Sequence, residues 1–151
     1  MERNVRTVLG VAFPSGHLRR STRGASDRPY AFDVSHGVGL PRSGHPPFHY
    51  MVAVAGGRDV RCCPYATFGT QELSDHALTA LEGRKACLLG HHGVIATGST
   101  LQKALSLAIE IETLARMYLT CLTIGEPTLL PDDEMELVLE KFDRYGQARP
   151  A

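Results

Sequence analysis

The sequence predicts one domain of the layered α/β class. From Phe48 onward, apolar runs of strand length that are bounded by glycines alternate with long amphipathic segments. Strands and helices that interleave in this way pack with the helices over the faces of a sheet. The length of 151 residues is that of a single domain with one core of ordinary size.

The first 45 residues do not share this pattern. Arginines are mixed with Gly, Ser and Pro, and no helical or strand period persists. We therefore expect no evolved core in this part of the chain, and a change of character near Pro46.

After that point the first expected elements are two strands and a helix. Residues 50–55 are strand-like and stop at a pair of glycines, and residues 59–63 form a second short strand that ends at Pro64. A helix follows, because Thr70 can cap its N-terminus and the next two side chains favour the positive end of the dipole. Apolar side chains on one face of this helix are Leu73, Ala77, Ala80 and Leu81.

Two further strands and two helices complete the chain. Residues 86–89 predict a short buried strand, and residues 94–96 another, joined by a tight passage through His91, His92 and Gly93. Residues 101–122 carry apolar side chains at intervals of three and four, which predicts a long helix that ends before Gly125. A last helix begins around residues 131–132 with acidic side chains and ends before Gly146.

The composition excludes several classes of partner. Sixteen basic and sixteen acidic side chains cancel, so no net charge attracts nucleic acid or an anionic membrane. No apolar run approaches the ~20 residues of a membrane span, and the N-terminus lacks the apolar segment of a signal peptide. We expect a cytoplasmic protein that acts on a small molecule. Its cysteines, which form no CxxC pair, are expected to be reduced: Cys62, Cys63, Cys87 and Cys121.

The adjacent histidines His91 and His92 are the first candidates for chemistry. They lie where a strand ends beside a glycine, and turns of this kind present side chains to a cleft. Neighbouring side chains on a strand point to opposite sides, so both cannot bind one metal ion. From the spacing alone, a hydrogen-bonded structural histidine remains the alternative to a metal ligand.

Aromatic residues are the other candidates. Tyr50 could act as a proton donor if its hydroxyl faced a cleft, and a half-buried core tyrosine is the alternative. Phe68, Phe142 and Tyr145 fit core or interface positions as well as substrate contacts. Neither Cys62 nor Cys63 has a local activating group, which argues against a nucleophilic thiol.

Four blocks of sequence resemble the class II aldolase family, of the L-fuculose-1-phosphate aldolase type. They are HYMVAVAGG (49–57), PYATFGTQELSDHA (64–77), LLGHHGVIA (88–96) and LEKFDRYG (139–146). Four blocks in order are far more specific than one motif. The resemblance implies a three-layer α/β fold with helices on a central, mainly antiparallel sheet, here truncated at the N-terminal side.

The resemblance also implies site residues, a cofactor and an assembly. His92 matches a Zn²⁺ ligand of the family, and Tyr50 matches its catalytic proton donor. Phe68 matches an active-site aromatic, while Phe142 and Tyr145 match C-terminal aromatics that reach a neighbouring subunit's site. The implied enzyme is a zinc-dependent aldehyde-lyase, typically a homotetramer, that cleaves a ketose 1-phosphate such as L-fuculose 1-phosphate into dihydroxyacetone phosphate and an aldehyde.

Other readings remain open. Pentose-phosphate epimerases and a thioribulose-phosphate dehydratase share the fold and differ in their substrate pockets. A non-catalytic oligomerisation module, as in adducin, belongs to a different functional class. A truncated product that does not fold is the third possibility for the chain as written.

The family's glutamate base and its H-x-H pair of zinc ligands are missing from this sequence. However, a codon read one base later keeps its second and third bases and takes the first base of the next codon. With suitable codons, residues 7–20 then read PSSEWRFHRDIYAA and residues 28–46 read VHTHSTYPTASACLGRDIP. Both strings resemble the family. They place its glutamate on the codon of Gly10 and its two histidines on those of Pro29 and Ala31.

We therefore predict three segments. Residues 1–46 are an aberrant segment translated out of frame, residues 47–146 are the C-terminal part of a class II aldolase/adducin domain, and residues 147–151 are a tail. One imidazole cannot hold a catalytic zinc ion. The chain as written is accordingly expected to be inactive.

Overall fold

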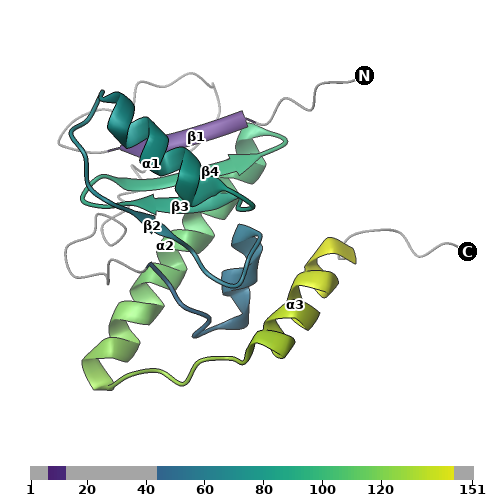
Figure 1. Cartoon of the computed structure of the whole chain (residues 1–151). Coiled ribbons are helices and arrows are strands. Elements are labelled where there is room, and N and C mark those ends of the chain that lie inside the picture. Colours follow the sequence, from purple (N-terminus) through teal and green to yellow (C-terminus); the bar gives the residue numbers. More distant parts are fainter. Residues whose placement is uncertain (1–6, 13–43, 145–151) are drawn as a thin grey trace, which may run out of the picture.

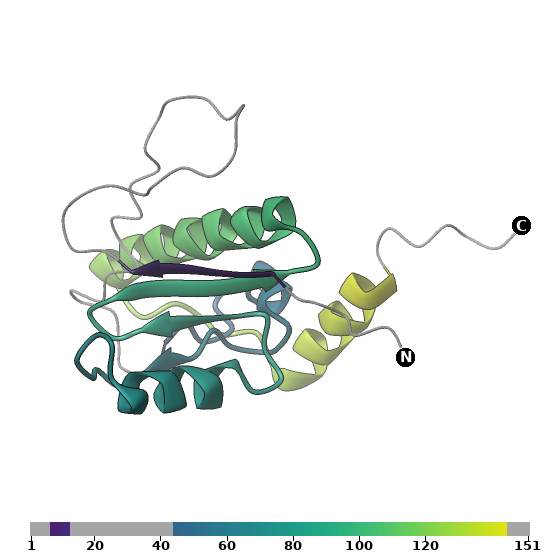
Figure 2. The same ribbon diagram turned by 90° about the horizontal axis from the view of Figure 1, so that it is seen from above.

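The computed structural model describes residues 7–12 and 44–144, which form three layers around a four-stranded sheet (Figures 1 and 2). The strand order is β1-β4-β3-β2, and two of the three pairings are antiparallel. The strands are β1 (Thr7–Ala12), β2 (Cys62–Cys63), β3 (Ala86–Leu89) and β4 (Gly93–Gly98). This arrangement confirms the predicted α/β class with a mainly antiparallel sheet.

Helices cover both faces of the sheet. Helix α1 (Gln71–Leu81) lies on one face, and the long helix α2 (Leu101–Ile124) crosses the other, as Figure 2 shows. A 3₁₀ helix, η1 (Tyr50–Ala55), packs between α2 and the last helix, α3 (Asp132–Arg144). No helix in the described ranges is long and apolar enough to cross a membrane.

The predicted strand at residues 50–55 was wrong, because this segment is η1. The His49 Nδ1 atom accepts a hydrogen bond from the Met51 backbone N–H at 3.3 Å and so caps the first turn. Val52 and Ala55, three residues apart, are both fully buried, which is the repeat of a 3₁₀ helix. Gly56 ends the helix in the left-handed conformation at φ 88°.

The sheet edges also differ from expectation. The strand predicted at residues 59–63 is reduced to β2, and Val60 forms an isolated bridge with His45 instead. Strand β1, which no sequence period predicted, pairs antiparallel with β4. The predictions for α1, β3, β4, α2 and α3 are confirmed, including Thr70 as the N-cap of α1.

The N-cap of α2 gives a first prediction. The Thr100 hydroxyl accepts a hydrogen bond from the Lys103 backbone N–H at 3.2 Å. We expect Thr100→Ala to lower the free energy of unfolding by about 1 kcal/mol, as measured by urea denaturation. Thr113→Ala is the matched control, because Thr113 is an exposed threonine in the middle of the same helix and Ala is the better helix former. Equal losses in the two variants would contradict a capping role.

The main core lies between the sheet, α2, η1 and α3. Its largest fully buried apolar side chains are Leu88, Ile111, Leu114, Met135, Val52, Val60 and Val94. A smaller cluster under α1 holds Cys63, Ala77, Ala80, Cys87 and Leu89. Burial raises the pKa of the Cys87 thiol to about 12, in agreement with an inert, reduced cysteine.

One polar side chain in this region is fully enclosed. His45 has no exposed surface, and within residues 7–12 and 44–144 neither of its ring nitrogens has a hydrogen-bond partner. Burial lowers its pKa from 6.5 to about 4, against a smaller opposing effect of the Glu112 carboxylate. The neutral imidazole is therefore the form that the fold accepts.

The titration of His45 gives a prediction for pH dependence. Because the folded pKa is about 4 and the unfolded value 6.5, the unfolded chain binds more protons between these pH values. Stability is then complete above pH 6.5 and falls on acidification towards pH 4, by about 3 kcal/mol from this group. Urea denaturation at pH 7 and pH 4.5 measures the loss. His45→Asn, which cannot titrate, should lose less, and an equal loss in both proteins would contradict the assignment.

Candidate functional site

The turn between β3 and β4 fixes the candidate ligand His92. Gly90 and His91 make the turn, and His91 takes φ 58°, an uncommon conformation for a side chain other than glycine. His92 is 8% exposed, and its backbone N–H donates to the Leu89 carbonyl at 2.9 Å. The two histidines consequently differ in environment, with His91 exposed and His92 enclosed.

Residues 64–69, between β2 and α1, cover the His92 ring. The Nε2 atom of His92 lies 2.7 Å from the Ala66 carbonyl oxygen. The Tyr65 ring stacks on the imidazole with centroids 5.1 Å apart and an interplanar angle of 12°. The Tyr65 ring also makes an edge-on contact with the ring of His91. Sequence reasoning did not select Tyr65, because nothing in its local pattern shows that the segment folds back over the turn.

Tyr50 and Phe142 lie together in a different place. They line a cavity of about 730 Å³ between η1 and α3. Tyr50 is 51% exposed, and the centroid of the His49 ring lies 4.8 Å from that of its own ring. The remaining lining residues are Phe48, His49, Leu130, Glu134, Val138 and Lys141. This cavity combines an apolar wall with a phenol, an imidazole and two charged groups.

The expected site residues thus fall into two groups on one protomer. His92 is enclosed by the loop at 64–69, and Phe68 on that loop is 76% exposed. Tyr50 and Phe142 line the cavity, which does not include His92. Tyr145 lies outside the described residues, as do Pro29 and Ala31.

The described residues do not fit a catalytic zinc ion by themselves. In residues 7–12 and 44–144, no group of three or more His, Cys, Asp or Glu side chains is placed to hold a metal. The Nε2 atom of His92 is already engaged with the Ala66 carbonyl oxygen. Three protein ligands are the usual minimum for catalytic zinc, so His92 alone cannot hold it.

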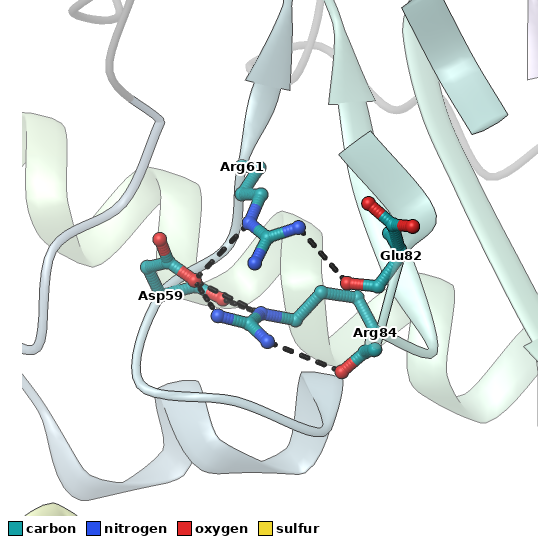
Figure 3. A network of polar contacts seen from close by, with 5 residues as sticks. Asp59, Arg61, Glu82 and Arg84 are labelled. Atoms are coloured by element: carbon teal, nitrogen blue, oxygen red, sulfur yellow. Dashed lines mark hydrogen bonds and ion pairs between the residues drawn. The ribbon is translucent and has the colours of Figure 1, made fainter. Parts of the chain in front are cut away.

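A polar network anchors β2 beside β3 (Figure 3). The Arg84 guanidinium forms an ion pair with the Asp59 carboxylate and donates to the Asp59 carbonyl oxygen at 3.2 Å. Arg61 donates to the Glu82 carbonyl oxygen at 2.9 Å. These contacts fix the strand that leads into the loop over His92. Both guanidinium groups share the Asp59 carboxylate, and Glu82 takes part through its backbone carbonyl oxygen.

Comparisons with known proteins place the chain in a family. The profile described as "Class II Aldolase and Adducin N-terminal domain" matches residues 29–119, a range that begins ahead of Pro46. The chain is 67% identical over 101 residues to a 5-methylthioribulose-1-phosphate/5-deoxyribulose-1-phosphate aldolase of Rhodospirillum rubrum, covering 67% of this chain and 46% of the relative. It is 48% identical over 141 residues to the L-fuculose phosphate aldolase of Escherichia coli K12, covering 88% and 66%.

Solved structures agree with the sequence matches. An L-fuculose 1-phosphate aldolase superposes with a TM-score of 0.68 at 44% identity, covering 74% of this chain and 52% of that structure. YgbL of Klebsiella pneumoniae, described as a putative aldolase/epimerase/decarboxylase, gives 0.57 at 30% identity, covering 72% and 52%. The chain spans about half to two-thirds of the length of these relatives. It belongs to the class II aldolase family, of the type represented by L-fuculose phosphate aldolase.

Proposed function

We propose that the protein in its complete form is an aldehyde-lyase that cleaves a ketose 1-phosphate into dihydroxyacetone phosphate and an aldehyde. The observation that supports this most directly is the enclosed His92 at the β3–β4 turn, in a chain of the class II aldolase family. Its ring is held by a carbonyl oxygen and a stacked tyrosine. A histidine kept in one orientation is suited to ligate a metal or to contact substrate.

In this proposal Tyr50 handles a proton. Written in the direction of synthesis, the enediolate of dihydroxyacetone phosphate attacks the aldehyde carbon, and the Tyr50 hydroxyl protonates the new alkoxide. The exposed phenol beside a cavity with apolar walls has the access that this role needs. Phe142 lines the same cavity and would contact the aldehyde, and Phe68 and Tyr145 are proposed as further aromatic contacts.

Zinc remains the proposed cofactor of the complete protein. His92 would be one ligand, and the other ligands and the base would come from residues that the described part of the chain does not supply. No catalytic step can be assigned to a metal on the residues described. For the chain as written we propose little or no activity.

The assembly is proposed to be a homotetramer. His92 and Tyr50 belong to separate groups on one protomer, and the cavity at Tyr50 excludes His92. A site completed by a neighbouring subunit would bring the two groups to one substrate. Size-exclusion chromatography with light scattering of the complete protein tests the tetramer.

The identity of the ketose phosphate is open between two kinds of relative. One kind carries names for L-fuculose phosphate, and the other for 5-methylthioribulose and 5-deoxyribulose 1-phosphates. All three substrates would release short aldehydes with an apolar end. Assays of the complete protein with these phosphates, coupled to detection of dihydroxyacetone phosphate, decide among them. Failure on every ketose 1-phosphate would overturn the proposal.

A non-catalytic oligomerisation module is the second candidate. It is favoured for the written chain by the lack of three clustered metal ligands among the described residues. Metal analysis of the complete protein separates the candidates. A stoichiometric zinc ion supports the enzyme, and a folded oligomer without zinc or cleavage activity supports the module.

A further inference from the structure

The side chain of His45 is out of keeping with the position that it occupies. It is among the largest fully buried side chains, and its ring packs edge-on against that of Tyr118, with centroids 5.6 Å apart. In the part of the chain that the structure describes, neither ring nitrogen has a hydrogen-bond partner. A buried polar group without partners destabilises a fold by about as much as a lost hydrogen bond, and such groups are rare in evolved cores.

The backbone of residue 45 is nevertheless well fixed. Its N–H donates to the Val60 carbonyl oxygen at 2.9 Å, and its carbonyl oxygen accepts from the Val60 N–H at 3.0 Å. This bridge does not depend on the side chain. Val60 belongs to the main apolar core, and Phe48 packs against the same Tyr118 ring. The position is therefore built into the core, and an aliphatic side chain of similar size would suit it.

We propose that residue 45 is occupied by histidine only because the coding sequence is read one base out of register up to this point. In this proposal His45 is encoded by CAT, which together with the first base of the Pro46 codon reads ATC one base later. That triplet encodes isoleucine. The aliphatic residue that the core position needs is the one that the displaced frame supplies.

The same inference locates the point at which the reading frame changes. The register from Phe48 onward agrees with the core, since Val52 and Ala55 point inward from η1. The proposed change of frame therefore falls between His45 and Phe48, and a CCC codon for Pro46 would read as proline in both frames. This position of the frame change is inferred from the burial of His45 and does not depend on the proposed aldolase activity.

At residue 44 the described backbone suits the present glycine and not the residue that the displaced frame would supply. If the Gly44 codon is GGA, the displaced frame reads it together with the next base as GAC, which encodes aspartate. In the present backbone Gly44 has φ 79°, and a Cβ atom there would lie 2.0 Å from the Val60 carbonyl oxygen. Aspartate at residue 44 would therefore require a different backbone path into residue 45.

The nucleotide sequence of the locus tests the proposal first. We expect codon 45 to be CAT. We also expect the displaced frame to be free of stop codons upstream to codon 7. CAC at codon 45, which would give threonine, or a stop codon in the displaced frame between codons 28 and 46, would overturn it.

Protein variants test the same point on the chain as written. We expect His45→Ile to raise the folding equilibrium constant by about tenfold to a hundredfold in urea denaturation. His45→Asn is the matched control, because it stays polar and should give no gain, and Gly44→Asp alone should destabilise. A loss of stability in His45→Ile would overturn the inference. If the frame and this gain are found but the restored protein shows no aldol cleavage, the proposed function fails and the frame assignment stands.

Discussion

Restoring the displaced frame ahead of Phe48 is expected to raise the rate of aldol cleavage at least about a thousandfold above that of the written chain. The written chain carries one imidazole of the proposed metal site, His92, and no clustered ligands within the described residues. The restored segment would add two histidines, on the codons of Pro29 and Ala31, and a glutamate on that of Gly10. Three imidazoles are a usual donor set for catalytic zinc, and a carboxylate can act as the base.

The measurement compares two purified proteins from one locus. One is translated as written. In the other, the reading frame is shifted by one base at the start of the displaced segment and shifted back at its end, and the protein also carries whatever N-terminal sequence the locus encodes. Release of dihydroxyacetone phosphate and bound zinc are measured on both. A gene recoded with synonymous codons, which yields the written protein but closes the displaced frame, is the control and should remain inactive. Full activity of the written chain would contradict the expectation, as would a restored protein that folds without binding zinc.

The positions of most helices and strands could be predicted from local patterns in the sequence. The three-and-four spacing of α2 and the threonines at positions 70 and 100 determine where helices begin and which faces are buried. The segment 50–55 could not be assigned in this way. A six-residue apolar run satisfies a strand and a 3₁₀ helix equally, and the decision depends on the His49 cap and on Gly56.

The candidate site depended more on tertiary contacts. The sequence singled out His92 and Tyr50, but their separation into two groups is a property of the packed protomer. Tyr65 was missed because its stacking on His92 joins residues that are distant in sequence. The buried state of His45 could not be foreseen either, since it requires the bridge to Val60 and the ring of Tyr118. These contacts show which residue conflicts with its surroundings.

Tyr50→Phe in the restored protein is expected to lower kcat for cleavage by about 10²-fold to 10⁴-fold, with little change in KM. The substitution keeps the ring beside the cavity and removes only the hydroxyl, for which we propose proton exchange with the substrate oxygen. Removal of the proton from dihydroxyacetone phosphate does not require this hydroxyl. Exchange of that proton with D₂O, followed by NMR without aldehyde, should therefore persist at a near-normal rate.

Tyr65→Phe is the matched control for this prediction. It also removes one phenolic hydroxyl, but it keeps the ring that stacks on His92, so cleavage should fall by less than about threefold. Loss of proton exchange together with cleavage in Tyr50→Phe would show that the tyrosine supports the fold of the site rather than the alkoxide step. Equal losses of kcat in the two variants would also remove the special role of Tyr50. Retained exchange with lost cleavage is the result that only a proton donor at the alkoxide explains, because a misfolded site would lose both reactions.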